Sequence, residues 1–512
     1  LLPSLKDPDV RPDGRSTPSV WRWANSSLNT EQQAAIQNIV RAEQRPLPYI
    51  IFGPPGTGKT TTVVEAVYQL CKHEDNLRIL LVAPSNDAAD VLVERLSQYF
   101  PPSELCRVIA YSRTIDMLPA PIQSYAREKV SEGGKIGEIL RMKIVVATVN
   151  FAARLVFLGV PRGHFDVLCV DEAGHATEPE VVSAAASIMD FTEESNRCGQ
   201  LILAGDPKQL GPIVTSDICR RFGLEKSYME RLTEDEAYAR KSGTYPKELI
   251  TKLIRNYRSH YSILKLPNEL FYDGDLITSS DFGVSHNLSK WEYLPRQGFP
   301  IVFHSMEGEN LREGNSPSWY NPQEAMQAVE YVDLLLNRSR PPLRSEEIGI
   351  ITPYHRQAQK IRLALDKKGI GKDIKVGSVE VFQGQERRCI ILSTVRSETE
   401  HLTTDLRFNL GFVSNKKRFN VAITRAKALL IVIGCPRVLA LDKDNWHPFM
   451  THCWENGGWV GDEWDPHTDD ETIDLRDEED DFESEDEEDD EIVVAPSQMV
   501  QQGAAGFIAR EE

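Results

Sequence analysis

Residues 53–60, with the sequence Gly-Pro-Pro-Gly-Thr-Gly-Lys-Thr, match the phosphate-binding loop G-x-x-x-x-G-K-[ST] at each of its fixed positions. A buried parallel strand is predicted for the apolar run Pro48–Phe52 before the loop, and a helix is predicted for Thr60–Tyr68 after it. In this setting we expect the Lys59 ammonium to reach the β and γ phosphates of a nucleoside triphosphate, and the Thr60 hydroxyl to bind Mg²⁺. The alternative is a glycine-rich turn that only packs a strand on a helix. The residues of this segment predicted to contact the nucleotide are Gly53, Pro54, Pro55, Gly56, Thr57, Gly58, Lys59, Thr60 and Thr61.

Two adjacent carboxylates, Asp171 and Glu172, follow the apolar run Val167–Val170, which predicts another buried strand. A residue that follows a strand of a parallel sheet lies at the sheet edge where ligands bind. Asp171 is therefore a predicted Mg²⁺ ligand, and Glu172 is a predicted base that orients and deprotonates water. The alternative for this pair is a helix N-cap with acidic residues in its first turn.

Three further side chains suit phosphoryl transfer. Gln209 lies in the segment Gly205–Pro212 after an apolar run and is predicted to touch the γ phosphate, although the glycine and proline content alone would predict a turn. Arg258 and Arg425 lie in the second half of the chain, and a guanidinium that reaches the γ phosphate stabilises the charge of the transition state. Taken singly, either arginine is equally typical of a surface salt bridge.

The elements that must position these residues are two sets of short apolar, β-branched runs that alternate with helical patterns. Each predicted strand runs into a polar or glycine-rich segment at its carboxyl end, where open α/β sheets bind ligands. We therefore predict an α/β protein with two parallel-sheet domains in tandem and one nucleotide between them. The predicted strands are Tyr49–Phe52, Ile79–Ala83, Ile144–Ala147, Val167–Val170 and Leu201–Ala204 in the first set, and Pro300–His304, Ile348–Ile351, Val376–Val381, Ile390–Thr394 and Leu429–Ile433 in the second.

The negative charge of this 512-residue chain is concentrated near its C-terminal end. The net charge is −19, and the segment 462–491 holds twenty acidic residues and one basic residue, Arg476, so the rest of the chain is neutral overall. A neutral body is compatible with nucleic-acid binding, which needs a local basic groove rather than a global excess. The run 469–491 has almost no apolar residues and is predicted to be disordered, either as a solubilising tail or as a segment that binds a partner or mimics nucleic acid.

Eight cysteines, none of them in a C-x-x-C pair, are scattered among apolar segments. This pattern is typical of reduced, buried thiols in the cytosol or nucleus, and no ligand spacing suggests structural zinc. No apolar run approaches the roughly 20 residues that span a bilayer, and the first residues lack the features of a signal peptide. The sequence therefore predicts a soluble protein of two to four domains with no membrane partner.

As a set, the motifs resemble those of superfamily 1 helicases of the up-frameshift-like group, and within it most closely the branch of the Armitage and Moloney-leukaemia-virus RNA helicases. The resemblance covers Trp21–Gly461, and the segment Arg312–Pro322 is similar to the Armitage branch in particular. The zinc module of the up-frameshift proteins, and most of their stalk and barrel, have no counterpart in this sequence. Besides the segments above, the motifs are Leu28–Gln32, Ala83–Asn86, Ala147–Thr148, Arg255–His260, Thr352–Tyr354, Val376–Glu386 and Val421–Lys427.

The resemblance implies two RecA-like domains, ATP as the fuel together with Mg²⁺, and movement from 5′ to 3′ on single strands. It assigns Gln32 to the adenine edge, Tyr257 to stacking on the base and Glu386 to the ribose. Single-stranded RNA is the implied partner, with DNA left open, and proteins of RNA silencing or RNA decay are implied partners of a monomer in the cytoplasm or nucleus. The residues implied to hold the strand backbone are Ser85, Asn86, Thr148, Thr352 and Ser378.

The predicted function is that of an ATP-dependent RNA helicase or translocase, and a DNA helicase of the same group is the alternative. A ring-forming P-loop ATPase would not need the motif that ends at Lys427. A scaffold that had lost hydrolysis would be expected to lack Glu172 or one of the two arginines. The expected domains are an N-terminal remnant or linker at 1–23, a RecA-like domain at 24–245 with an insertion at about 101–141, a second RecA-like domain at 246–461, and an acidic disordered tail at 462–512.

Overall fold

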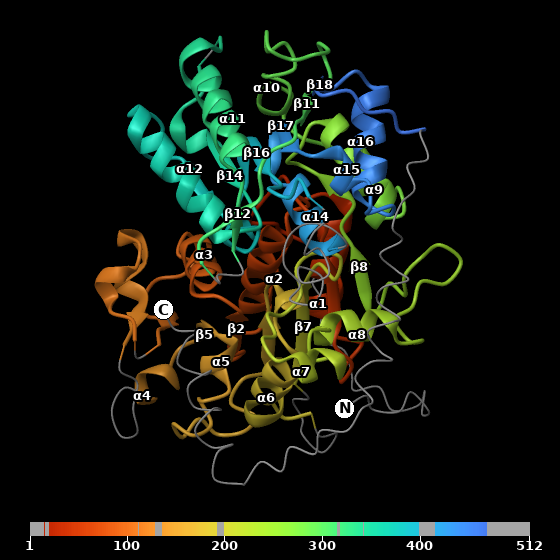
Figure 1. The fold of residues 1–512 in the computed structure, drawn as a ribbon. Coiled ribbons are helices and arrows are strands. Elements are labelled where there is room, and N and C mark those ends of the chain that lie inside the picture. The colour runs from red at the N-terminus through yellow and green to blue at the C-terminus, as the bar shows by residue number, and fades with distance from the viewer. Residues whose placement is uncertain are drawn as a thin grey trace, which may run out of the picture.

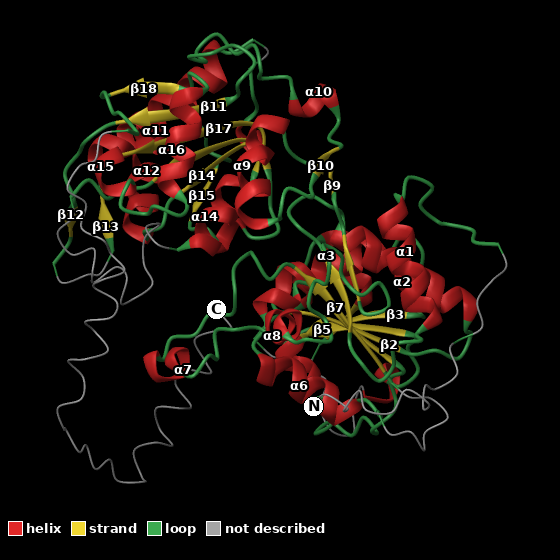
Figure 2. Cartoon of the chain, turned by 90° about the vertical axis from the view of Figure 1, so that its right-hand side faces the viewer, coloured by secondary structure: helices red, strands yellow, loops and turns green. Residues whose placement is uncertain are grey.

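The computed structural model describes residues 15, 20–110, 112–128, 136–191, 199–314, 318–340, 342–398 and 415–467. Two parallel β-sheets, each accompanied by helices, form the lower and upper lobes in Figure 1, and Figure 2 shows the two lobes after a quarter turn. This arrangement confirms the predicted α/β fold with two RecA-like sheets in tandem. The predicted tail from residue 469 onward lies outside the described residues.

The first sheet has eight strands in the order β4-β3-β5-β2-β6-β7-β1-β8, and neighbouring strands run parallel. Its strands are β1 (Tyr49–Phe52), β2 (Ile79–Ala83), β3 (Leu105–Val108), β4 (Ala126–Arg127), β5 (Ile144–Thr148), β6 (Val167–Val170), β7 (Gln200–Gly205) and β8 (Ile250–Lys252). The helices of this lobe are α1 (Thr30–Arg41), α2 (Lys59–His73), α3 (Asn86–Leu96), α4 (Ile136–Ile139), α5 (Val149–Ala152), α6 (Glu178–Ile188), α7 (Asp217–Arg221) and α8 (Tyr228–Glu234).

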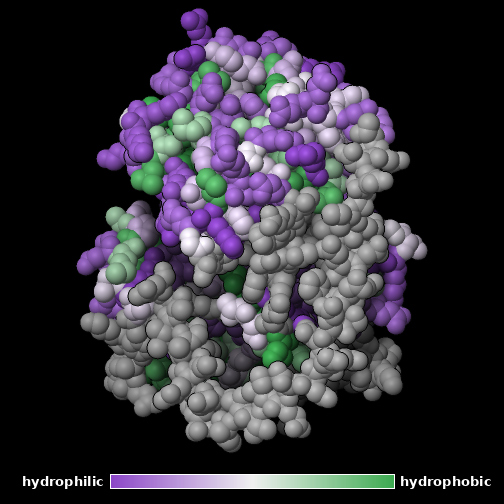
Figure 3. Space-filling model, viewed as in Figure 1, coloured by the Kyte–Doolittle hydropathy of each residue, from purple (hydrophilic) through white to green (hydrophobic). Residues whose placement is uncertain are grey.

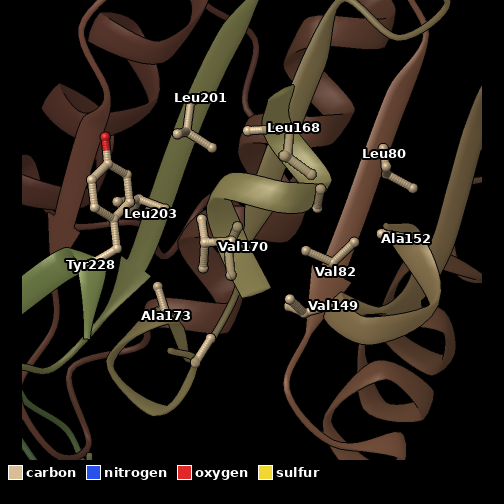
Figure 4. Packing of buried hydrophobic residues seen from close by; sticks show 14 of the residues in the cluster. Leu80, Val82, Val149, Ala152, Leu168, Val170, Ala173, Leu201, Leu203 and Tyr228 are labelled. Atoms are coloured by element: carbon tan, nitrogen blue, oxygen red, sulfur yellow. The ribbon is translucent and has the colours of Figure 1, made fainter. Parts of the chain in front are cut away.

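The core of the first lobe lies on both faces of this sheet. Leu80 and Val82 of β2 share one hydrophobic cluster with Leu168 and Val170 of β6, as Figure 4 shows. Leu81, which lies between the first two in sequence, belongs to a second cluster on the opposite face. Because side chains alternate along a strand, apolar residues at successive positions bury both faces and fix the strand ends that carry polar residues.

The second sheet has six strands in the order β15-β14-β16-β17-β11-β18, also parallel. Its strands are β11 (Ile301–Ser305), β14 (Ile348–Ile351), β15 (Lys375–Gly377), β16 (Arg387–Ser393), β17 (Ala426–Gly434) and β18 (Trp459–Gly461). The helices are α9 (Tyr261–Phe271), α10 (Phe282–Ser285), α11 (Pro322–Asp333), α12 (His355–Lys368), α14 (Lys416–Ile423), α15 (Pro436–Leu439) and α16 (Trp446–Glu455). Two short ribbons pair β9 (Arg255–Asn256) with β10 (Ile277–Thr278), and β12 (Leu311–Arg312) with β13 (Trp319–Tyr320).

Each predicted strand overlaps an observed strand, but one prediction is only half right. The run Val376–Val381 was predicted as one strand, whereas β15 ends at Gly377 and a 3₁₀ turn forms over Glu380–Phe382. Val379 and Phe382 are both buried in the core of the second lobe, which the turn allows and a continued strand would not, because alternate residues of a strand face opposite sides.

Three strands change the expected domain boundaries. β8 lies beyond residue 245, yet it pairs in parallel with β1 and so belongs to the first sheet rather than to the second domain. The predicted insertion at about 101–141 contains β3 and β4, and β3 pairs with β5, so this segment widens the first sheet. Strands this short and flanked by polar residues give little sequence signal, because pairing with a neighbour determines them more than propensity does.

The second lobe continues past residue 461, where its end was predicted. Trp459 of β18 stacks on Phe303 with ring centroids 4.5 Å apart and on Trp464 with centroids 5.2 Å apart. Such aromatic pairs add roughly 0.5–1.5 kcal/mol beyond burial, so Trp464 is part of the folded lobe. Among the described helices, none combines the length and apolar character needed to cross a membrane. The coloured part of the upper lobe presents a largely hydrophilic surface in Figure 3.

Deletion of residues 468–512 is expected to leave ATP turnover on a short single strand broadly unchanged, because all the motifs and the Trp459–Trp464 stack are retained. The steady-state rate of phosphate release measures this. As a comparison, deletion from residue 462 removes Trp464 and is expected to lower the melting temperature. A large change in turnover for the shorter deletion would instead place the acidic segment in the strand-binding groove.

Candidate nucleotide site at the seam between the lobes

The phosphate loop joins β1 to α2 and faces the second lobe. Gly56 and Gly58 have φ angles of 68° and 83°, a left-handed conformation that favours glycine. A Cβ atom at Gly53 would lie 1.9 Å from Cγ of Lys59, so only glycine allows the lysine to fold over the loop. There the Lys59 ammonium donates to the carbonyl oxygen of Gly53 at 2.9 Å. The loop thus presents an ammonium and the N-terminal N–H groups of α2 together, a setting that favours phosphate.

Thr60 and Asp171 come together beside the loop. The Thr60 hydroxyl donates to Oδ2 of Asp171 at 3.1 Å, and burial, reinforced by the charge of Glu172, raises the pKa of Asp171 to about 6. Magnesium is usually held by one or two side-chain oxygens together with substrate phosphates and water. A buried carboxylate next to a hydroxyl and a second carboxylate fits that requirement, so the predicted metal ligands Thr60 and Asp171 are brought together.

Glu172 has a strained backbone. Its φ angle is 52°, in the left-handed region, which costs a non-glycine residue roughly 1–3 kcal/mol. Its N–H donates to Oδ1 of Asp171 at 3.1 Å, while its side chain makes no capping hydrogen bond to the 3₁₀ turn Ala173–His175. The side chain therefore does not act as the helix cap considered from the sequence.

Gln209 and Arg425 meet across the seam. Nη2 of Arg425 donates to Oε1 of Gln209 at 2.9 Å, and Nε of Arg425 donates to the carbonyl oxygen of Val421 at 3.0 Å. Arg425 is only 1% exposed, and burial lowers its pKa to about 9, so the guanidinium stays charged at neutral pH. Nε2 of Gln209 donates to Asp206 at 2.6 Å, and Asp206 also accepts the hydroxyl of Tyr272 at 2.8 Å.

Arg258 packs directly on the phosphate loop. A Cβ atom at Gly56 would lie 2.5 Å from Cβ of Arg258, and Nη1 of Arg258 donates to the carbonyl oxygen of Thr424 at 3.0 Å. Its Nε forms an ion pair with Glu386, which also pairs with Lys427 at 2.7 Å. Although burial opposes the shift, these two cations lower the pKa of Glu386 to about 2. Glu386 is bound to two cations in this arrangement, and its contact with a ribose stays a prediction.

The predicted base-binding residues lie at one end of the loop. Nε2 of Gln32 donates to the carbonyl oxygen of Thr57 at 3.1 Å, and its Oε1 accepts the N–H of Asn29 in a capping box at the start of α1. Asn29 in turn donates to the hydroxyl of Tyr257 at 2.8 Å, and the Tyr257 side chain is 42% exposed. Thr61, on the first turn of α2, accepts a hydrogen bond from Arg95 at 3.2 Å.

Several residues that position this site have no role predicted from the sequence. Asn256 donates to the carbonyl oxygen of Pro55 at 2.7 Å, so β9 holds the phosphate loop, and Asp206 holds Gln209. Lys427 shares Glu386 with Arg258, and Asn29 orients Tyr257. All four residues lie inside motifs that are visible in the sequence, so membership of a motif could have identified them. Their partners are known only from the structure.

The residues implied to hold a strand divide between accessible and buried positions. Ser85 follows β2, and Thr148 is the last residue of the neighbouring strand β5; their hydroxyls cap α3 and α5. Asn86 accepts a hydrogen bond from Arg107, and Ser378 is hydrogen-bonded to Glu380. Thr352 has no exposed surface in this arrangement, and its hydroxyl has no partner among the described residues, so its predicted contact with a strand stays a prediction.

Comparison with known proteins gives matches along most of the chain. Two family models, both described as AAA domain, match this chain. One matches residues 27–131 and 123–217, and the other matches residues 224–437. A putative helicase mov-10-B.1 of Danio rerio is 45% identical over 465 residues, which are 87% of this chain and 45% of that protein. The RNA helicase Mov10l1 of Homo sapiens is 45% identical over 426 residues, 82% of this chain and 34% of that protein.

The probable RNA helicase armi of Drosophila melanogaster is 37% identical over 480 residues, 86% of this chain and 39% of that protein. The chain therefore spans less than half the length of these curated relatives. Its similarity to them covers both lobes, since the aligned share of this chain exceeds four fifths in each case.

Replacement of Lys59 by alanine is expected to abolish ATP turnover, because it removes the one ammonium that folds over the phosphate loop. Phosphate release in the presence of a single strand measures this. Lys72→Ala, near the far end of the same helix, is the matched control and should retain turnover. Near-normal turnover in Lys59→Ala would rule out this site.

Proposed function

Because the chain belongs to the up-frameshift-like superfamily 1 helicases, in the branch of the Armitage and Moloney-leukaemia-virus RNA helicases, we propose that it hydrolyses ATP to move along single-stranded RNA. The observation that carries this proposal is the composite site. Lys59, Asp171 and Glu172 come from the first lobe, while Arg258 and Arg425 come from segments of the second half and reach the same seam.

A composite site couples chemistry to motion. Arg258 lies against the phosphate loop and Arg425 lies against Gln209, so a triphosphate on the loop would meet two guanidinium groups in addition to Lys59. Positioned arginines of this kind accelerate phosphoryl transfer by about 10³–10⁵-fold. Once the γ phosphate has left, the arginines lose that partner and the lobes are free to separate.

Glu172 is the proposed base. It is next in sequence to the metal-binding Asp171, and its strained backbone is held by the hydrogen bond from its own N–H to that neighbour. Glu172 takes the proton of the attacking water, and Gln209, held by Asp206, contacts the γ phosphate. Bound Mg²⁺ would neutralise phosphate charge between Thr60 and Asp171.

The strand is proposed to cross the carboxyl edge of the first sheet near Ser85, Asn86 and Thr148 and to continue to Ser378 on the second lobe. Polar contacts of this kind address the sugar-phosphate backbone and tolerate any base sequence, as a translocase requires. The direction from 5′ to 3′ is carried over from the family. We propose RNA rather than DNA as the substrate because relatives that match both lobes are named RNA helicases.

Cellular context is also a proposal. The described cysteines are free thiols, and burial raises the pKa of Cys71 and Cys106 to about 12, which supports a reducing compartment such as the cytoplasm or nucleus. Partners from RNA silencing or RNA decay, and action as a monomer, are proposed from the family. A ring-forming ATPase is less well supported because the second arginine-bearing lobe lies in the same chain.

Replacement of Glu172 by glutamine is expected to retain ATP and strand binding while the hydrolysis rate falls by about 10²–10⁴-fold, since a positioned base contributes that much. Binding of a fluorescent ATP analogue and phosphate release are measured in parallel. Glu94→Gln, an exposed change on α3, is the matched control. Intact hydrolysis in Glu172→Gln would assign the base to another residue.

The proposed substrate is tested by the ATPase rate with single-stranded RNA and with DNA of the same sequence, at one stated salt concentration. RNA is expected to stimulate the rate more strongly. Stimulation by DNA alone would favour the DNA helicase of the same group, and stimulation by neither strand would favour a P-loop ATPase that does not act on nucleic acid.

A further inference from the structure

A polar cavity lies at the amino-terminal edge of the first sheet, the edge opposite the phosphate loop. The segments that lead into β2, β5 and β6 form it, and its volume is about 600 Å³. These three strands end at Ala83, Thr148 and Val170, next to Ser85 and Asp171, so each strand has one end at the cavity and the other at the proposed functional edge. No residue assigned above to nucleotide or strand binding lines the cavity.

The cavity has an excess of positive charge. It contains two carboxylates, and one of them, Asp166, already accepts the backbone N–H of Arg78 at 2.8 Å. Within the described part of the chain, none of its cationic side chains forms an ion pair with a carboxylate. The four cationic residues that line it are Arg78, Arg141, Lys143 and Arg162.

Two of these cations are held in place by neutral groups. Nη1 of Arg78 lies 3.3 Å from Nδ1 of His164, and since a guanidinium can only donate, the ring nitrogen accepts. Burial and the charge of Arg78 lower the pKa of His164, which keeps that ring neutral. The Lys143 ammonium donates to the carbonyl oxygen of Cys71 at 2.9 Å. Both side chains have further N–H groups that can donate to a ligand.

From this cavity we propose a second binding site, for a small phosphorylated anion. The four cations exceed the two carboxylates by two charges. A phosphate monoester carries about −1.5 to −2 charges at neutral pH, so one phosphate group matches this excess, whereas a single carboxylate does not. Guanidinium groups bind phosphate oxygens in pairs, and the volume lies within the range of small-molecule sites. Among the described residues, no Phe, Tyr or Trp lines the cavity, so we expect the charged groups rather than a stacked base to be recognised.

The site is independent of the ATP site. A ligand here contacts the loops before β2, β5 and β6 and does not compete with a nucleotide at the other edge. It is therefore expected to stabilise the first lobe in addition to any effect of ATP, because a ligand that binds only the folded state raises the melting temperature.

The test uses the full chain carrying Lys59→Ala, so that the phosphate loop contributes least to binding of a polyanion and no turnover is needed. Inorganic tripolyphosphate and myo-inositol hexakisphosphate are titrated separately by calorimetry at fixed salt, with citrate as a tricarboxylate. We expect one-to-one binding of at least one phosphorylated probe, and the two arms distinguish a linear inorganic ligand from a phosphorylated ring. Binding of neither probe, or equally tight binding of citrate, would overturn the proposal.

The residues are tested with the double change Arg141→Ala and Arg162→Ala on the same background. Both side chains are exposed, so folding should be retained, and the melting temperature without ligand checks this. We expect the dissociation constant to rise at least tenfold, whereas Arg154→Ala, an exposed arginine of the same lobe outside the cavity, should leave it unchanged. An unchanged constant in the double variant would place the ligand elsewhere. Failure of this test leaves the proposed ATPase unaffected, because the two sites share no residue.

Discussion

Burial of one charged side chain, the Arg425 guanidinium, at the seam is the constraint on which the functional arrangement depends. Moving an ion out of water costs several kcal/mol unless hydrogen bonds replace those to water. Arg425 recovers them from Val421 of the preceding helix α14 and from Gln209 in the other lobe. The guanidinium also donates to Thr424 and Gln385 of its own lobe. The hydrogen bond to Gln209 forms only while the two lobes are in contact, and the phosphate loop is completed under the same condition.

Besides apolar contacts, such as Leu210 in the core cluster of the second lobe and Tyr272 in that of the first, the seam contains polar contacts, which suit an interface that has to open. Asn420 of the second lobe donates to the Tyr272 hydroxyl at 2.8 Å, and Tyr272 donates to Asp206 of the first lobe. Lys417 of α14 bridges to Glu230 of α8 at 2.7 Å. Water can replace each of these partners, whereas separation of an apolar interface would expose surface at about 25 cal/mol per Å². The lobes can thus have a defined closed arrangement without being held permanently closed.

Sequence patterns predicted the strands and the loop that have a strong local signal. The runs at β1, β2 and β6 are apolar along their whole length, and the loop Gly53–Thr60 has fixed residue types, so both were found. β8 was assigned to the wrong domain because its three residues become a strand only through pairing with β1. The burial of Thr352 and the pairing of Glu386 with two cations depend on side chains that are distant in sequence. Such features follow from packing, which no single segment encodes.

Glu386 explains how Arg258 can be kept ready for a nucleotide. Its carboxylate presents two oxygens to Arg258 and Lys427, the same kind of acceptor that a phosphate offers. Without such a partner, desolvation of a charged arginine beside the phosphate loop would cost free energy, or the side chain would turn toward water. With it, arrival of a γ phosphate exchanges one anionic acceptor for another, and Lys427 keeps Glu386 neutralised while Arg258 moves. The exchange changes the partner of Arg258 but not the number of charge-assisted hydrogen bonds that Arg258 makes. The free-energy barrier for Arg258 to bind and release phosphate can therefore stay low in each cycle.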